Sequence, residues 1–108
     1  MSEPYLRGHM AAYVISEVCI LDEGAAAQYR QLAAASIIKY GGRYLSRAAE
    51  VRVIEGEPTS HRLVIVEFPS MERAHEWYRS ADYAKALQYR DKALTRRLIF
   101  VDGMGEPA

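Results

Sequence analysis

The sequence contains one cysteine, three histidines and no long run of apolar residues. Cys19, being alone, cannot form an intrachain disulfide, which suits a reducing compartment, and its apolar neighbours indicate a small buried side chain. No apolar run approaches the roughly 18 residues that a membrane-spanning helix needs, and the first residues do not resemble an export signal. We therefore predict a cytoplasmic protein with no membrane partner.

An excess of charge of one sign is also missing. Fourteen Lys and Arg residues balance fourteen Asp and Glu residues, so we expect no basic surface for the phosphates of a nucleic acid. The sequence also lacks phosphate-binding glycine loops, the GxSxG nucleophile turn, the HExxH metal motif and paired cysteines. These absences predict a protein that uses no metal or cofactor and binds no nucleic acid.

The residues that are present suffice for one globular domain. The 108 residues are 50% hydrophobic and 26% charged, and a chain of this length buries a single core. The domain is predicted to span residues 10–103, between a flexible N-terminal extension, 1–9, and a flexible tail, 104–108.

The first half of the chain predicts a strand, a helix and a second strand. Residues 12–20 are rich in β-branched residues, which is typical of a strand. Asp22 is a helix N-cap, and the glycines at 41 and 42 end that helix. Residues 43–47 and 50–55 are strand pieces, forming either one long bent strand, which we favour, or a tight pair.

The second half repeats the pattern. A turn at 56–61 precedes a strand at 62–68, and Ser70 caps a helix. The helix breaks near Ser80 and Asp82, a second helical piece extends to Leu94, and residues 97–102 form the last strand. The order strand, helix, strand, strand, helix, strand predicts an α+β, ferredoxin-like fold: a four-stranded antiparallel sheet with the helices on one face.

The opposite face of this sheet is expected to be too apolar for water. Alternation along the strands places on it five side chains: Tyr13, Ile15, Cys19, Leu63 and Ile65. We therefore expect a homodimer in which two sheets close face to face around a shared barrel.

Six segments, in order, carry a resemblance to a known family: AYVISEV, YGGRYLSR, VIEG, RLVIVEFPS, WYRSADY and RLIFVDG. The chain resembles the domain of unknown function 1330 family (DUF1330), a branch of the dimeric α/β-barrel superfamily. The resemblance implies a ferredoxin-like protomer, dimerisation through the sheets and a pocket between sheet and partner, but no established activity. Distant relatives include monooxygenases, haem-degrading enzymes and lactone isomerases, so the fold alone does not select a reaction.

Two carboxylates are the candidate catalytic residues. The alternation that points Val64 and Phe68 toward the helices points Glu67 into the dimer interior, and Glu17 has the same parity on the first strand. Burial suits either as a general acid or base. Arg43, Arg47 and Arg62 are candidates to balance their charge, and in the structural alternative such ion pairs only determine how the dimer assembles.

Four further residues are candidate ligand-binding groups. Arg43 is a candidate anchor for an anionic ligand, Tyr13 lies on the apolar face, and Tyr78 and Tyr83 flank the helix break as the family motif suggests. His75 falls off the apolar stripe of its helix, so we expect it in solvent and not on a haem.

These residues leave three hypotheses for function. The first is a homodimer that binds a small anionic or aromatic ligand in its barrel, with cofactor-free acid–base chemistry by Glu17 or Glu67. The second is a non-catalytic dimer in which the Glu and Arg groups only specify assembly. The third, a monooxygenase, depends on superfamily analogy alone.

Overall fold

The computed structural model describes residues 10–104, in which four strands and three helices form. The predicted extension, 1–9, and residues 105–108 of the predicted tail lie outside the described residues. The elements are β1 (Ala12–Ile20), α1 (Glu23–Lys39), β2 (Arg43–Ala49), β3 (Arg62–Phe68), α2 (Met71–Tyr78), α3 (Ala81–Ala93) and β4 (Leu94–Asp102).

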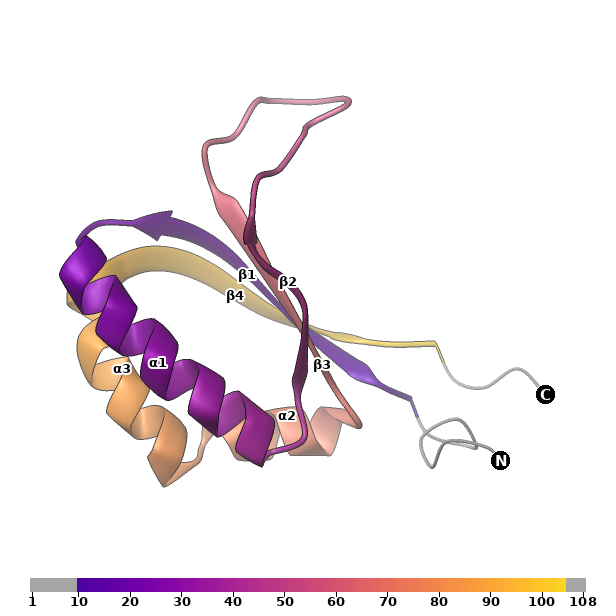
Figure 1. Ribbon diagram of the computed structural model, residues 1–108. Coiled ribbons are helices and arrows are strands. Elements are labelled where there is room, and N and C mark those ends of the chain that lie inside the picture. Colours follow the sequence, from indigo (N-terminus) through magenta and orange to yellow (C-terminus); the bar gives the residue numbers. More distant parts are fainter. Residues whose placement is uncertain (1–9, 105–108) are drawn as a thin grey trace.

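The strands form one antiparallel sheet in the order β2-β3-β1-β4. All three helices cover the same face, and α1 and α3 lie side by side across it (Figure 1). This arrangement confirms the α+β, ferredoxin-like fold. We call the covered side of the sheet the helix face and the other side the open face.

Side-chain parity divides the two faces as predicted. Val14 and Val18 on β1 and Val66 and Phe68 on β3 are buried in the core with the helices. The antiparallel register pairs Val14 with Val66 and Ile15 with Ile65. Residues of odd number on these two strands therefore point to the open face.

The helix starts and stops follow the predicted signals. Asp22 Oδ1 accepts a hydrogen bond of 2.9 Å from Ala25 N, and Ser70 and Ser80 cap α2 and α3 in the same way. Gly41 has φ +87°, which favours glycine. At Gly42 a Cβ would lie 2.8 Å from side-chain atoms of Ile37 and Phe68, so the close approach of α1 to β3 requires glycine there.

The favoured long bent strand through residue 55 is wrong, because β2 ends at Ala49. The strand β3 begins at Arg62, and its Leu63 already pairs with Ala49, so no partner strand is left for residues 50–55. Residues 50–61 instead form a long connection that projects from the sheet (Figure 1).

The start of the last strand also differs from the prediction. β4 begins at Leu94, where φ is −162° and ψ 162°, and not at Arg97. Leu94 pairs with Ile20, and the pairing continues without interruption to Asp102. Edge pairing with β1 thus extends the strand over residues whose spacing also fits a helix.

Two bulges redirect β2. Leu45 is an extra residue between the pairs Tyr44–Val66 and Ser46–Ile65, and Ala48 is a second one beyond the pair Arg47–Val64. An extra residue inverts the parity of the residues after it. Arg47 therefore shares the helix face with Val64, although it is four residues from Arg43, which faces the other way.

Ala48 provides a test of the second bulge. Its φ of 54° lies in the left-handed region, which costs a non-glycine residue about 1–2 kcal/mol. We expect Ala48→Gly to raise the free energy of unfolding by about 0.5–1 kcal/mol, after the entropy that glycine gains in the unfolded chain is subtracted. Urea unfolding measures this. Ala49→Gly, in the same strand without positive φ, is the matched control and should destabilise; equal effects would contradict the bulge geometry.

Candidate functional site

A cavity lies between α1 and the helix face of the sheet. Its walls are largely apolar and include Val14, Val18, Ile37, Val66, Trp77 and Leu98. The volume open to the centres of water molecules inside it is about 80 Å³. One water molecule needs about 10–15 Å³ by that measure, so the space holds several waters or one small organic molecule. We call it the inner cavity.

Arg96 supplies a cation to this apolar space. It lies on β4 opposite Val18, and its Nη1 donates a hydrogen bond of 2.8 Å to the Tyr29 hydroxyl. Its guanidinium carbon lies 5.7 Å and 5.9 Å from the ring centroids of Tyr29 and Tyr83. Within residues 10–104 no carboxylate lies within ion-pair distance of it. A largely buried guanidinium without a counter-ion is costly unless something else compensates it.

Two polar atoms in the lining have no hydrogen-bond partner among residues 10–104. They are Arg96 Nη2 and Ser16 Oγ, both buried, and both residues line the inner cavity. The register places Ser16 opposite Leu98, one diagonal step from Arg96, and diagonal neighbours lie within reach of a long side chain. Unpaired buried donors cost about 1–3 kcal/mol each, so their presence together indicates a site for an acceptor.

The tyrosines beside Arg96 form the rest of its polar surroundings. The hydroxyls of Tyr29 and Tyr83 are 2.5 Å apart. Burial raises the pKa of Tyr83, and the neighbouring Tyr29 raises it further. Burial disfavours the charged form of Arg96, but Tyr29 and Tyr83 outweigh burial and raise its pKa. Tyr83 is therefore a neutral phenol beside a permanent cation.

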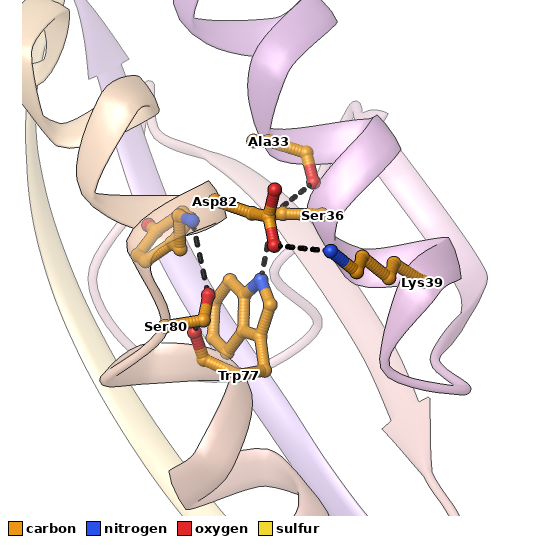
Figure 2. A network of polar contacts seen from close by, with 7 residues as sticks. Ala33, Ser36, Lys39, Trp77, Ser80 and Asp82 are labelled. Carbon is orange, nitrogen blue, oxygen red and sulfur yellow. Dashed lines mark hydrogen bonds and ion pairs between the residues drawn. The ribbon is translucent and has the colours of Figure 1, made fainter.

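The Trp77 wall of the cavity is held in place by polar contacts. Trp77 Nε1 donates to Ser36 Oγ at 2.9 Å, and Ser36 Oγ donates to the Ala33 carbonyl at 2.8 Å. Nearby, Lys39 and Asp82 form an ion pair of 2.8 Å. Figure 2 shows these contacts joining α1 to Trp77 near the end of α2 and to Asp82 in the first turn of α3. The hydrogen bond to Ser36 holds the indole ring of Trp77 against α1, the helix that covers the cavity.

Two more arginines line the cavity where it meets solvent. Arg30 on α1 pairs with Glu23 at 3.5 Å. Arg47 lies with its guanidinium carbon 4.4 Å from the ring centroid of Tyr44. The lining contains these two arginines and Arg96 but no Asp or Glu. Its electrostatic character therefore favours an anion.

The predicted catalytic carboxylates lie on the open face and are far apart. Glu17 pairs with Leu63, and Glu67 with Tyr13, so the two positions differ by four residues along neighbouring strands, about 13 Å. Glu67 is buried and accepts a hydrogen bond of 2.7 Å from Arg43 Nε. Glu17 lies 3.4 Å from Arg97 Nη1, a partner that the sequence did not suggest. Neither carboxylate lines the inner cavity.

The structure divides the predicted ligand-binding residues into two groups, Arg43 with Tyr13 on one side of the sheet and Tyr78 with Tyr83, whose ring centroids are 5.8 Å apart, on the other. Arg43 and Tyr13 belong to the open face with Glu67. Tyr83 is fully buried on the helix side, within hydrogen-bond distance of Tyr29. Tyr78 is partly exposed, and its ring lies 6.2 Å from that of Phe100. Only Tyr83 is in contact with the polar group at the inner cavity.

The remaining candidates carry no site of their own. His75 is exposed, as predicted, with its ring 5.1 Å from that of Phe100. Cys19 is half-buried and free. Over residues 10–104, no three His, Cys, Asp or Glu side chains gather as metal ligands, and none of the helices is long and apolar enough to cross a membrane.

Sequence reasoning missed Ser16 and Arg96 as site residues, and it grouped Arg47 with the carboxylates of the open face, whereas Arg47 lines the inner cavity. Arg96 was hidden because the sequence pattern places the start of the last strand at Arg97. The alternation of Leu94, Leu98 and Phe100 was the available signal: extended back to Leu94, it puts Arg96 on the helix face. Arg47 needs the Leu45 bulge, for which the sequence carries no comparable signal.

Comparison with known proteins agrees with this fold. The class is the ferredoxin-like α+β protein described above. The chain belongs to the family described as Domain of unknown function (DUF1330), which it matches over residues 11–104, and the resemblance noted in the sequence is thereby confirmed. A search of curated proteins found no match.

Two solved structures are similar. The crystal structure of methylated RPA0582 protein has a TM-score of 0.73 at 18% identity, covering 88% of this chain and 82% of that one. The crystal structure of RPA0582, a protein of unknown function from Rhodopseudomonas palustris, has a TM-score of 0.72 at 19% identity, covering 88% and 83%. At these identities the likeness extends to the fold alone.

Because Arg96 has no carboxylate partner among the described residues, we predict that its substitution by an apolar residue has little effect on the free energy of unfolding. Arg96→Met keeps much of the length of the side chain and removes a buried charge, and such replacements are often neutral or stabilising. We expect the free energy of unfolding of the ligand-free protein to change by no more than about 1 kcal/mol, measured by urea unfolding. Arg97→Met, at the next residue on the opposite face, is the control. A large loss for Arg96→Met alone would show that the guanidinium holds the fold together.

Proposed function

We propose that this protein binds a small organic anion, a carboxylate with a compact apolar body, in the inner cavity. The observation that carries the proposal is the half-buried Arg96, which has no carboxylate partner in the described chain and whose buried Nη2 is unpaired, as is Ser16 Oγ one diagonal step away. A bound carboxylate supplies the missing counter-ion and accepts from both atoms. The apolar walls accommodate the rest of the ligand.

The ligand position differs from the one expected from the sequence. A pocket in the dimer barrel would hold the ligand beside Glu67 and Arg43, which already neutralise each other at 2.7 Å. A free cation attracts an anion more strongly than one already paired with a carboxylate. The inner cavity is therefore the better anion site, and Arg43 with Glu67 is better assigned to assembly.

Matched pairs of acid and amide test the binding. We expect benzoate and 3-methylbutanoate to raise the melting temperature, and benzamide and 3-methylbutanamide to leave it unchanged, because the neutral amides cannot compensate Arg96. Bound ligand at 100 times its Kd adds about 2.7 kcal/mol of stability, which a thermal melt detects.

Variants locate the site. Arg96→Gln should abolish the carboxylate effect, and Ser16→Ala should weaken affinity about fivefold while leaving or raising the stability of the ligand-free protein, since it removes an unpaired hydroxyl. Arg97→Gln is the matched control and should bind normally. Equal responses to acid and amide, or full binding by Arg96→Gln, would overturn the proposal.

We further propose that the protein is a homodimer through its open face. No described helix covers that face, yet it carries half-buried Ile15, Leu63, Ile65 and Ile99 around its centre. The ion pairs Arg43–Glu67 and Arg97–Glu17 flank this apolar centre. A second copy buries the apolar part and leaves the paired charges to fix its orientation.

Sedimentation tests this assembly. We expect a dimer at micromolar concentration and a folded monomer for Ile65→Glu, whereas Ile38→Glu, at an exposed position on α1, should stay dimeric. A monomeric parent protein would contradict the proposal.

Glu67→Gln separates the roles of the carboxylate. A weakened dimer with normal benzoate binding supports assembly. An intact dimer that has lost ligand binding supports the alternative in which Glu67 serves acid–base chemistry in the barrel.

A further inference from the structure

The geometry points to a second anion-binding group at the entrance of the inner cavity, Arg47, and hence to a ligand with a negative charge at each end. This inference depends on the proposed function, because it assumes that Arg96 holds the first carboxylate. It specifies the class of ligand: a dicarboxylate with an apolar linker.

The position of Arg47 results from the first β2 bulge. In regular pairing, Arg47 would share the open face with Arg43. The extra residue, Leu45, inverts the parity, so that Arg47 pairs with Val64 and lines the inner cavity. Bulges of this kind occur next to functional sites, where they redirect a side chain. Here the bulge directs the Arg47 cation toward a cavity whose lining already contains the Arg96 cation.

Arg47 and Arg96 line the cavity from the two edge strands of the sheet, β2 and β4. The register forms one row across the sheet, from Arg47 on β2 through Val64 and Ser16 to Leu98 on β4. Strands are spaced about 4.8 Å apart, so about 10 Å of sheet separates the backbones of Arg47 and Ser16. Val64, the side chain that lies between them in this row, is apolar. An apolar linker with a carboxylate at each end matches this order of groups.

Arg47 also has capacity for a ligand. Its described contact is with the Tyr44 ring, which leaves the guanidinium edge free of a carboxylate, and no ion pair joins it to another residue of the described chain. Arg30, at the same entrance, is already paired with Glu23. The two arginines therefore provide a matched comparison within one site.

Calorimetric titration with linear acids tests the inference. The probes are hexanoate and the diacids from butanedioate to octanedioate. We expect the best diacid to bind about tenfold more tightly than hexanoate, as one additional charge-assisted contact at a partly exposed site would give. Arg47→Gln should remove this preference and leave the Kd of hexanoate within about twofold. Arg47→Lys should restore part of it, and Arg30→Gln and Arg62→Gln should keep it.

The outcomes separate the two proposals. Equal affinity of the parent protein for hexanoate and every diacid overturns the second contact and leaves the anion site intact. A diacid preference that survives Arg47→Gln overturns the role of Arg47. Weakening of hexanoate and diacid by the same factor in Arg47→Gln indicates general attraction by charge and also overturns it. Absence of binding by every acid overturns the proposed function itself.

Discussion

The hydrogen-bonded group of Arg96, Tyr29 and Tyr83 is the constraint that determines the shape and charge of the space beneath the helices. It joins β4, α1 and α3, and the two helices make extensive contact with each other. Because the group is large and polar, the helices cannot settle onto the sheet as they would onto aliphatic side chains. The inner cavity lies beside this group. Arg96 therefore both limits how closely the helices approach the sheet and gives the cavity a positive charge.

The two faces of the sheet deal with charge differently. On the open face each described carboxylate of β1 and β3 has an arginine: Glu67 has Arg43, and Glu17 has Arg97. On the helix face, neither Arg96 nor Arg47 forms an ion pair with a carboxylate of the part of the chain that the structure describes. A protein whose overall charge is zero thus has a local cationic site, which the total composition concealed.

Regular segments were predictable because one rule decided each of them. Asp22, Ser70 and the glycine pair after α1 are local signals with a local mechanism, and alternation assigned the faces of β1 and β3 correctly. Pairing between strands decided the rest. Where β2 ends depends on where β3 begins, and the start of β4 depends on Ile20 of β1. Arg47, near the end of β2, was therefore placed on the wrong face, and Arg96, near the start of β4, was missed.

Three features of the inner cavity lining lower the stability of the ligand-free protein. Ser16 Oγ and Arg96 Nη2 are buried without partners, and Ala48 has a left-handed backbone in the cavity lining. Each is a cost to the ligand-free fold that an apolar residue or a glycine would avoid. All three belong to the lining of the inner cavity. Unfavourable features gathered in one lining support the proposed binding, because selection for folding alone gives no reason for them to collect there.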